Sequence, residues 1–268
     1  MRMRWVILIW SGLLLAGGQA SAHDTWILAT PSGASRPSFR IDLTSGMAFP
    51  ALGSGIRPER VTRAMLRIGG KSKALQAPVA TKASLRYSLP PAEPGVAVVW
   101  VQLAPRALDL EPKLVAEYLH EIGATESVGP RWRARPDPKT WHEVYRKHAK
   151  TFLRTGATAP SESSWREPVG MELELMPESD PTSLTASSPC SLVLLKDGRP
   201  LAGLPVAAER GSGKARTRTF ATSDAQGRVI FQLDRTGPWL FAATELREKG
   251  AEWESDFTTL TVVVVPAR

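Results

Sequence analysis

The sequence predicts a mainly β protein made of two β-sandwich units of the immunoglobulin type with a short α-helical insertion. Two observations lead to this prediction. Short runs of apolar and β-branched residues recur over residues 26–101 and again over residues 191–265, and many of them alternate apolar with polar side chains. Proline and glycine separate these runs, as turns separate the strands of a sandwich.

The start of the chain has the three parts of a secretory signal peptide. Residues 1–4 contain two arginines, residues 5–16 form an apolar run that is too short to cross a bilayer, and residues 20–22 read Ala-Ser-Ala. Cleavage after this sequence would make His23 the first residue of the mature chain. We therefore expect an exported protein, which is periplasmic in a cell with two membranes.

The rest of the chain, after the signal peptide of residues 1–22, divides into two predicted domains. Residues 23–175 form an N-terminal β-rich domain, in which the unbroken apolar run at residues 96–101 is typical of a central strand. Residues 186–268 form an immunoglobulin-like sandwich, in which the Asp-Gly pair at residues 197–198 favours a tight turn between strands.

The helical insertion covers about residues 111–155 and is predicted from a change in the hydrophobic period. Apolar residues recur at helical spacing over residues 112–122, and Gly123 fits the position that follows a helix C-terminus. A loop rich in arginine and proline follows. A second helix is predicted over residues 137–155, because four residues recur on one helix face. These residues are Trp141, Tyr145, His148 and Phe152.

Charge and cysteine content limit the partners of the chain. The net charge of +8 falls to +6 if Arg2 and Arg4 leave with the signal peptide, and the remaining basic residues are scattered rather than gathered in blocks. We therefore expect no nucleic-acid partner. Cys190 is the single cysteine, so no intrachain disulfide can form. No apolar stretch after the leader reaches the roughly 18 residues of a membrane span, so we expect no span in the mature chain.

The most specific chemistry in the sequence lies at His23. A free α-amino group and an imidazole on one residue form a bidentate chelator, and both nitrogens suit nickel, cobalt and copper. Asp24 adds a carboxylate beside them, and a further ligand must come from elsewhere in the chain. The predicted metal site therefore consists of His23, Asp24, His142 and His148, with His120 as a further candidate. The alternative is that His23 is an ordinary polar residue at the mature terminus.

The sequence predicts no catalytic residue. The segment that begins His142-Glu143 lacks the second histidine of the H-E-x-x-H zinc-protease motif, and motifs for a nucleophile elbow, a phosphate loop or a dinucleotide are absent. Glu172 and Glu174 share one face of a predicted strand, where exposed strand charges explain them as well as paired catalytic carboxylates do. We therefore expect a binding protein rather than an enzyme.

Several stretches together resemble the DUF4198 family, which is related to periplasmic components of nickel and cobalt uptake systems. They cover nearly the whole mature chain in order, and the C-terminal part is also similar to carboxypeptidase regulatory-like sandwiches, through the turn at residues 222–227. The stretches that resemble DUF4198 are residues 22–26 (AHDTW), 46–50 (GMAFP), 144–151 (VYRKHAKT), 170–177 (GMELELMP) with 180–181 (DP), and 197–206 (DGRPLAGLPV). The resemblance implies a periplasmic, β-rich protein connected with metal uptake.

These observations lead to one main hypothesis and two alternatives. The main hypothesis is an exported protein that binds a transition-metal ion, nickel, cobalt or copper, for uptake or for handoff to a membrane metal permease. The first alternative is a non-catalytic β-sandwich module that binds a protein or a glycan. The second is a copper enzyme with an N-terminal histidine brace, which would need a second histidine close to His23.

Overall fold

The computed structural model confirms a mainly β protein with a sandwich architecture. The predicted signal peptide, residues 1–22, lies outside the described residues. The structure describes residues 23–32, 38–90, 93–137, 139–156, 163–211 and 215–267.

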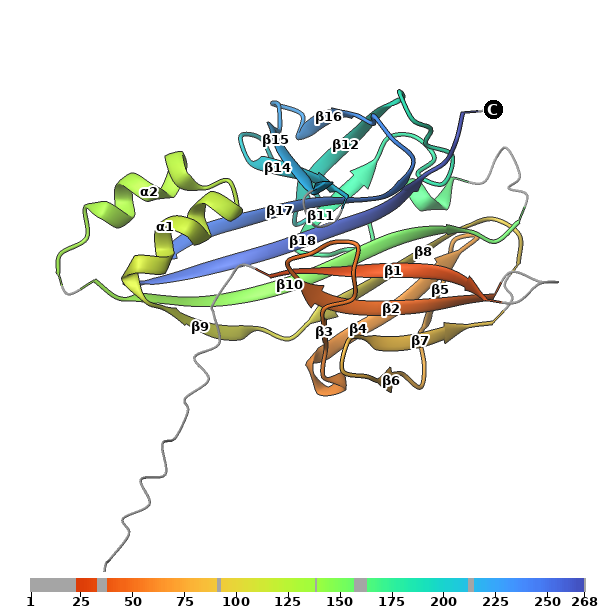
Figure 1. The fold of residues 1–268 in the computed structure, drawn as a ribbon, viewed down its shortest axis with the longest axis horizontal. Helices are drawn as coiled ribbons and strands as arrows, with labels where there is room; N and C mark the ends of the chain where they lie inside the picture. Colours follow the sequence, from red (N-terminus) through yellow and green to blue (C-terminus); the bar gives the residue numbers. More distant parts are fainter. Residues whose placement is uncertain are drawn as a thin grey trace, which may run out of the picture.

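The largest sheet, here called the central sheet, has nine strands among the described residues. These are β4 (Val61–Ile68), β5 (Lys71–Ala74), β8 (Val96–Leu103), β9 (Arg106–Leu110), β10 (Trp141–Arg154), β14 (Pro205–Arg210), β15 (Thr217–Thr222), β17 (Gly237–Lys249) and β18 (Glu252–Val264). Their order is β15–β14–β17–β18–β10–β8–β4–β5, and β9 pairs with the first part of β10 (Figure 1). Strands from both predicted domains therefore share one sheet.

Two smaller sheets pack against the central sheet. The N-terminal sheet has the order β1–β2–β7–β6, with β3 paired to β2, and the C-terminal sheet has the order β11–β12–β13, with β16 paired to β12. The N-terminal strands are β1 (Asp24–Ser32), β2 (Ser38–Gly46), β3 (Ser54–Gly55), β6 (Val79–Ala80) and β7 (Leu85–Leu89). The C-terminal strands are β11 (Leu173–Pro177), β12 (Pro189–Lys196), β13 (Arg199–Pro200) and β16 (Arg228–Gln232). Two short 3-10 helices, η1 (Pro58–Arg60) and η2 (Ser164–Arg166), lie in the connections.

Strand β8 contributes side chains to the cores on both faces of the central sheet. All eight of its residues are buried, and this confirms the central strand that the apolar run predicts. Val98 and Trp100 belong to the core shared with the C-terminal sheet, whereas Val99 and Val101 belong to the core shared with the N-terminal sheet. Because successive side chains of a strand point to opposite faces, the central sheet is covered on both sides.

The helices form the third packed region. Helix α1 (Pro112–Glu121) confirms the first predicted helix, and Gly123 follows it with a φ of +72°, which glycine adopts readily. Helix α2 (Thr125–Arg133) occupies the segment that was expected to be a loop. Both helices lie at one end of the molecule, beside the ends of β17 and β18 (Figure 1). None of the helices in the described part of the chain is long and apolar enough to cross a membrane.

The second predicted helix, over residues 137–155, is wrong. This segment is β10, which pairs in parallel with β18 from Glu143 opposite Trp253 to Thr151 opposite Thr261, and antiparallel with β8 and β9. The helical spacing arose because both faces of β10 are covered, so residues 148–153 are all buried and no apolar–polar alternation is visible. Sheet pairing over fourteen residues therefore overrides a local pattern that favours a helix.

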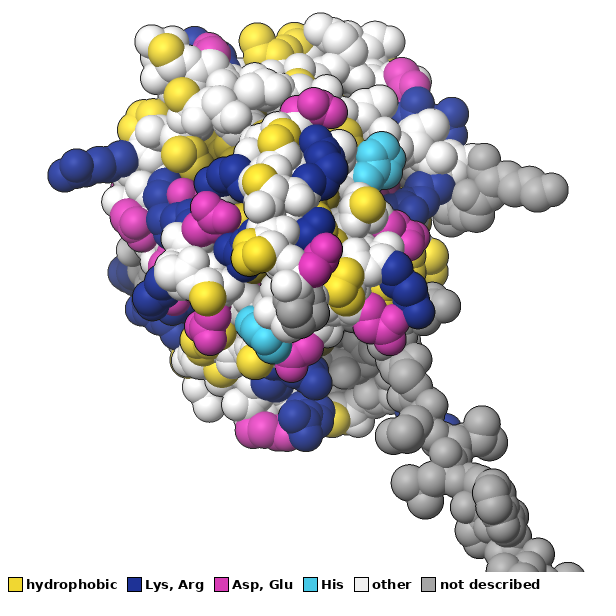
Figure 2. All heavy atoms as spheres, turned by 90° about the vertical axis from the view of Figure 1, so that its left-hand side faces the viewer, with side chains coloured by type: hydrophobic (Ala, Val, Ile, Leu, Met, Phe, Trp, Pro, Cys, Tyr) yellow, Lys and Arg dark blue, Asp and Glu magenta, His cyan; other side chains and the backbone are white. Residues whose placement is uncertain are grey.

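The end of the molecule that carries the helices has a mixed surface. Figure 2 shows lysine and arginine side chains there among aspartate and glutamate side chains, with single hydrophobic side chains between them. The net positive charge of the chain is therefore not concentrated on this face.

A buried ion pair joins the central sheet to the C-terminal sheet. Lys150 Nζ of β10 lies 2.7 Å from Glu174 Oε1 of β11, and both side chains are 1% exposed. The Glu174 carboxylate also accepts hydrogen bonds from the backbone N–H groups of Val169, Gly170 and Met171. Glu174 is therefore a buried structural residue, and the interpretation of Glu172 and Glu174 as exposed strand charges is wrong for Glu174.

We expect the substitution Lys150→Met to lower the free energy of unfolding by about 3 kcal/mol, because it leaves the Glu174 carboxylate buried without its cation. Urea denaturation followed by circular dichroism measures the change. The matched control is Lys113→Met, whose side chain is 76% exposed and which should change stability by no more than about 0.5 kcal/mol. An equal effect of the two substitutions would contradict a stabilising role for the buried pair.

Candidate functional site

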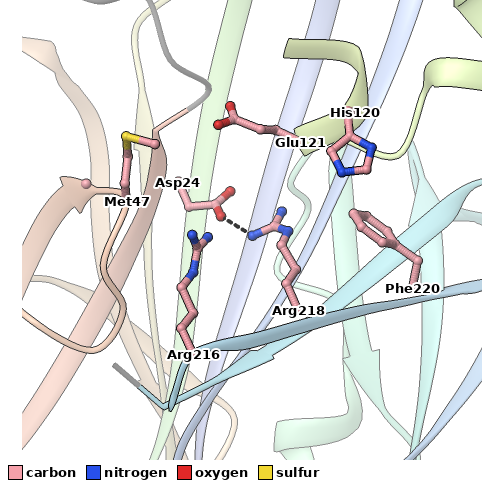
Figure 3. Close-up of a pocket in the computed structure, with 8 residues that line it drawn as sticks. Asp24, Met47, His120, Glu121, Arg216, Arg218 and Phe220 are labelled. Carbon is pink, nitrogen blue, oxygen red and sulfur yellow. Dashed lines mark hydrogen bonds and ion pairs between the residues drawn. The ribbon is translucent and has the colours of Figure 1, made fainter. Parts of the chain in front are cut away.

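A cavity of about 260 Å³ lies where the start of β1, the end of α1 and strand β15 meet (Figure 3). Most of its lining side chains are charged or polar, and two apolar side chains, Met47 and Phe220, lie among them. The lining residues are Asp24, Gly46, Met47, His120, Glu121, Arg216, Arg218 and Phe220. Four segments that are far apart in the sequence therefore meet at the cavity, and one of them is Asp24, the residue that follows His23.

The start of β1 is fixed by its pairing with β2. Asp24 lies opposite Gly46, and the next inward residue, Trp26, is buried edge-on against Phe49 at a centroid distance of 5.7 Å. A Cβ at Gly46 would lie 3.2 Å from the Trp26 ring, so the absence of a side chain here lets the indole pack closely under the cavity.

The end of α1 is held by a buried carboxylate on β10. Tyr118 Oη donates a 2.8 Å hydrogen bond to Glu143 Oε1, and Trp141 Nε1 donates one of 2.9 Å to Glu143 Oε2. Burial raises the pKa of Glu143. This anchor sets the last turn of α1, from which His120 and Glu121 reach the cavity. Gly123 completes the approach, because a Cβ there would come within 2.9 Å of the Phe220 ring.

Arg218 of β15 and Arg216, which comes just before this strand, form a charge network at the cavity floor. Arg218 Nη1 donates hydrogen bonds to Asp24 Oδ2 at 2.6 Å and to Glu209 Oε2 at 2.8 Å. Arg216 donates two hydrogen bonds to Glu209, of 2.8 and 2.9 Å, in a bidentate arrangement. Glu209 of β14 is 1% exposed, so a buried carboxylate orients both guanidinium groups, and Arg218 in turn ties β15 to Asp24, the first residue of β1.

The environment of His23 is mixed in charge. Burial lowers the pKa of its imidazole, and the neighbouring Lys147 lowers it further, whereas Glu121 and Asp24 raise it. Lys147 Nζ donates a hydrogen bond to the His23 carbonyl oxygen and lies over the rings of Tyr145 and Phe257. Burial also lowers the pKa of Lys147, to about 8.

The structure separates the four residues of the predicted metal site. Asp24 lines the cavity and His23 precedes it in the chain, whereas His142 is exposed at the start of β10 and forms an ion pair with Asp109. His148 is 2% exposed, and its Nε2 lies 2.9 Å from Glu172 Oε2 on the side of β10 that faces the C-terminal sheet. No group of three or more histidine, cysteine, aspartate and glutamate side chains that could hold a metal ion occurs among the described residues.

His120, the further candidate, does line the cavity together with Asp24. Glu121 is near enough to His23 to raise the pKa of its imidazole, and His120 lines the cavity with Asp24, the residue that follows His23. An imidazole nitrogen and a carboxylate oxygen are donors that a borderline transition-metal ion accepts.

The sequence alone does not identify Arg216 and Arg218 as residues of the site. They count there among the scattered basic residues of the chain. The available signal was their spacing with Phe220, since residues at i, i+2 and i+4 lie on one face of a strand. Their contact with Asp24, 194 residues away, had no local signal.

The fold and the cavity define a class: a mainly β sandwich protein with a charged pocket at the start of its first strand. The chain belongs to the family described as a domain of unknown function, DUF4198, whose profile matches residues 20–246. The comparison with curated proteins gave no match. Among solved structures, the chain is similar to native α2-macroglobulin of Escherichia coli spanning domains MG0-NIE-MG1, at 10% sequence identity. The match covers 92% of this chain and 98% of that one with a TM-score of 0.21, a value from which nothing follows about function.

The contact between His148 and Glu172 generates a prediction on pH dependence. This contact lowers the pKa of Glu172 from 4.5 to about 2. Since the folded-state pKa is depressed, the contribution to stability is present above about pH 4.5 and is lost as the pH falls toward 2. The stability difference between the wild type and Glu172→Gln, measured by thermal unfolding, should therefore be largest near pH 6 and vanish near pH 2. A difference that stays constant over this range would contradict the assignment.

Proposed function

We propose that this DUF4198 protein is exported and binds a transition-metal ion, nickel, cobalt or copper, at the N-terminus that cleavage before His23 would free. The observation that carries the proposal is that His120 and Glu121, at the end of α1, line the same cavity as Asp24. They place an imidazole and a carboxylate at the cavity that Asp24 lines, and Asp24 follows directly on the residue that would supply an amine and an imidazole of its own.

The roles of the residues follow from their contacts. The α-amino group and the imidazole of His23 would chelate the ion, and His120 would add a nitrogen donor from α1. Asp24 already accepts a hydrogen bond from Arg218, so its carboxylate would hold the terminus in place more than it would bind the metal. Lys147 would have the same positioning role through the His23 carbonyl oxygen. His142 and His148 have carboxylate partners of their own, so we do not include them.

A site at the accessible start of a chain suits exchange of the ion more than permanent storage. We propose that the protein acts in the periplasm in uptake or handoff, with a membrane metal permease as the receiver, and that it is not an enzyme. The DUF4198 resemblance to components of metal uptake systems supports this role.

Calorimetric titration with Ni²⁺ and with Cu²⁺ tests the proposal. The sample is protein whose N-terminal His23 has been confirmed by mass spectrometry. We expect submicromolar binding that weakens at least about tenfold in a variant with one alanine added before His23, because the α-amine is displaced. His120→Ala should also weaken binding, whereas His142→Ala, which changes an exposed histidine paired with Asp109, should not. Equally weak binding in the processed and extended proteins would overturn the proposal.

A second candidate function is supported by the apolar side chains at the cavity. Met47 and Phe220 are 44% and 42% exposed, and a non-catalytic module that binds a protein or a glycan would use such side chains. The histidine-brace enzyme would instead use His120 as the second histidine. The titration separates the binding module, which needs no metal, from both metal hypotheses, and oxidase activity of the copper-loaded protein would identify the enzyme.

A further inference from the structure

A second cavity, of about 330 Å³, lies where strands β4, β8 and β10 of the central sheet meet the segment that precedes β11. None of the described residues lines both this cavity and the one at the start of β1. The second cavity is therefore a separate site, and its lining carries charges of both signs. Its polar lining residues are Thr62, Arg63, Gln102, Arg146, His148 and Glu172.

The register of the central sheet places three of these polar side chains in one row. Arg63 of β4 lies opposite Gln102 of β8, and Gln102 lies opposite His148 of β10. Residues that are paired across neighbouring strands lie on the same face of a sheet. The row begins beside a β-bulge between Val61 and Arg63, a feature that re-aims side chains and recurs beside functional sites.

Two side chains of this row are buried and have polar atoms without a hydrogen-bond partner in the described part of the chain. Gln102 is 7% exposed, and its Nε2 lies 3.4 Å from Glu172 Oε2, whereas its Oε1 has no partner. His148 is 2% exposed, and its Nδ1 has no partner. Because an unpaired buried polar atom is costly, these two atoms indicate that a polar ligand occupies the cavity.

The unpaired atoms and the neighbouring carboxylate are hydrogen-bond acceptors. Since His148 Nε2 lies 2.9 Å from the Glu172 carboxylate, the proton of the neutral ring lies on Nε2, and Nδ1 is left as an acceptor. Gln102 Oε1 is an acceptor as well, and the Glu172 carboxylate is ionised, because its pKa is lowered to about 2. A primary ammonium group, with three N–H donors and a positive charge, is complementary to this set.

The same cavity also has a positive side. The guanidinium group of Arg63 is exposed and forms no ion pair with any of the described residues, and Arg146 Nη1 lies 3.4 Å from Asp256 Oδ1. A simple cation would be repelled by these two arginines, whereas a molecule that also carries a carboxylate gives Arg63 an acceptor of matching geometry. The volume of the cavity lies at the lower end of the range for small-molecule pockets, roughly 300–1,000 Å³.

We propose that this cavity binds a free α-amino acid, with the ammonium group of the ligand on Gln102 Oε1 and the Glu172 carboxylate and the carboxylate of the ligand on Arg63. An α-amino acid carries both charges on adjacent carbon atoms, as a cavity lined by both charges requires. The inference goes beyond the proposed function, because the two sites have different ligands and separate linings.

Thermal unfolding in the presence of each of the twenty amino acids at millimolar concentration tests the inference, because a ligand that binds the folded state raises the unfolding temperature. Calorimetric titration then follows with the amino acid that stabilises most. We expect its amide, which lacks the carboxylate, and its N-acetyl derivative, which lacks the ammonium group, each to bind at least about tenfold more weakly.

Substitutions at the cavity test each end of the ligand. Glu172→Gln and Arg63→Gln should each weaken binding of the amino acid about tenfold, because a charge-assisted hydrogen bond is lost. The matched control is Arg57→Gln, whose native side chain is 72% exposed and lies outside the cavity, and it should bind like the wild type. If Glu172→Gln fails to fold, Arg63→Gln, which changes an exposed side chain, still decides the question.

Three results would overturn the inference: no amino acid raises the unfolding temperature, either analogue binds as tightly as the amino acid itself, or Arg63→Gln binds like the wild type. None of them would affect the metal site of the proposed function, which is judged by nickel titration. We expect Arg63→Gln to bind nickel like the wild type, so the failure of one proposal can be told from the failure of the other.

Discussion

Strand β10 is the element on which the rest of the structure depends. It pairs in parallel with β18, so that residues 141–154 and residues 252–264 lie side by side in one sheet. This pairing makes the first and last parts of the chain a single packed unit. It also places β17, β14 and β15 on the far side of β18, and Arg218 of β15 donates a hydrogen bond to Asp24 at the start of β1.

The polar side chains of β10 connect it to every layer around it. Glu143 holds α1, Lys147 holds the carbonyl of His23, and Lys150 holds Glu174 of β11. Each of these groups is costly to bury alone, and each has a partner in a different element. A displacement of β10 by one residue would exchange its two faces and break all three contacts together. The strand therefore fixes the position of the candidate site as well as the fold.

The sequence predicts the elements whose signal is local. Residues 96–101 are apolar throughout and form the central part of β8, and the proline and glycine that bound α1 mark a real helix. The prediction for β10 is wrong because its buried charges resemble the polar face of a helix, and their partners lie in other elements of the fold. The site divides in the same way. His23 is singled out by the cleavage sequence that is predicted beside it, whereas the positions of His120, Arg216 and Arg218 around one cavity depend on the tertiary fold, which no local pattern records.

The charge balance at the cavity decides what kind of ligand it suits. Asp24 and Glu209 are each hydrogen-bonded to arginine, so the cavity floor offers an incoming molecule N–H donors rather than unengaged carboxylates. His120 and Glu121 lie on the other side of the cavity, at the end of α1 (Figure 3). Because the carboxylates at the floor are already engaged by arginine, the floor suits the acceptor atoms of an incoming molecule more than it suits a bare cation.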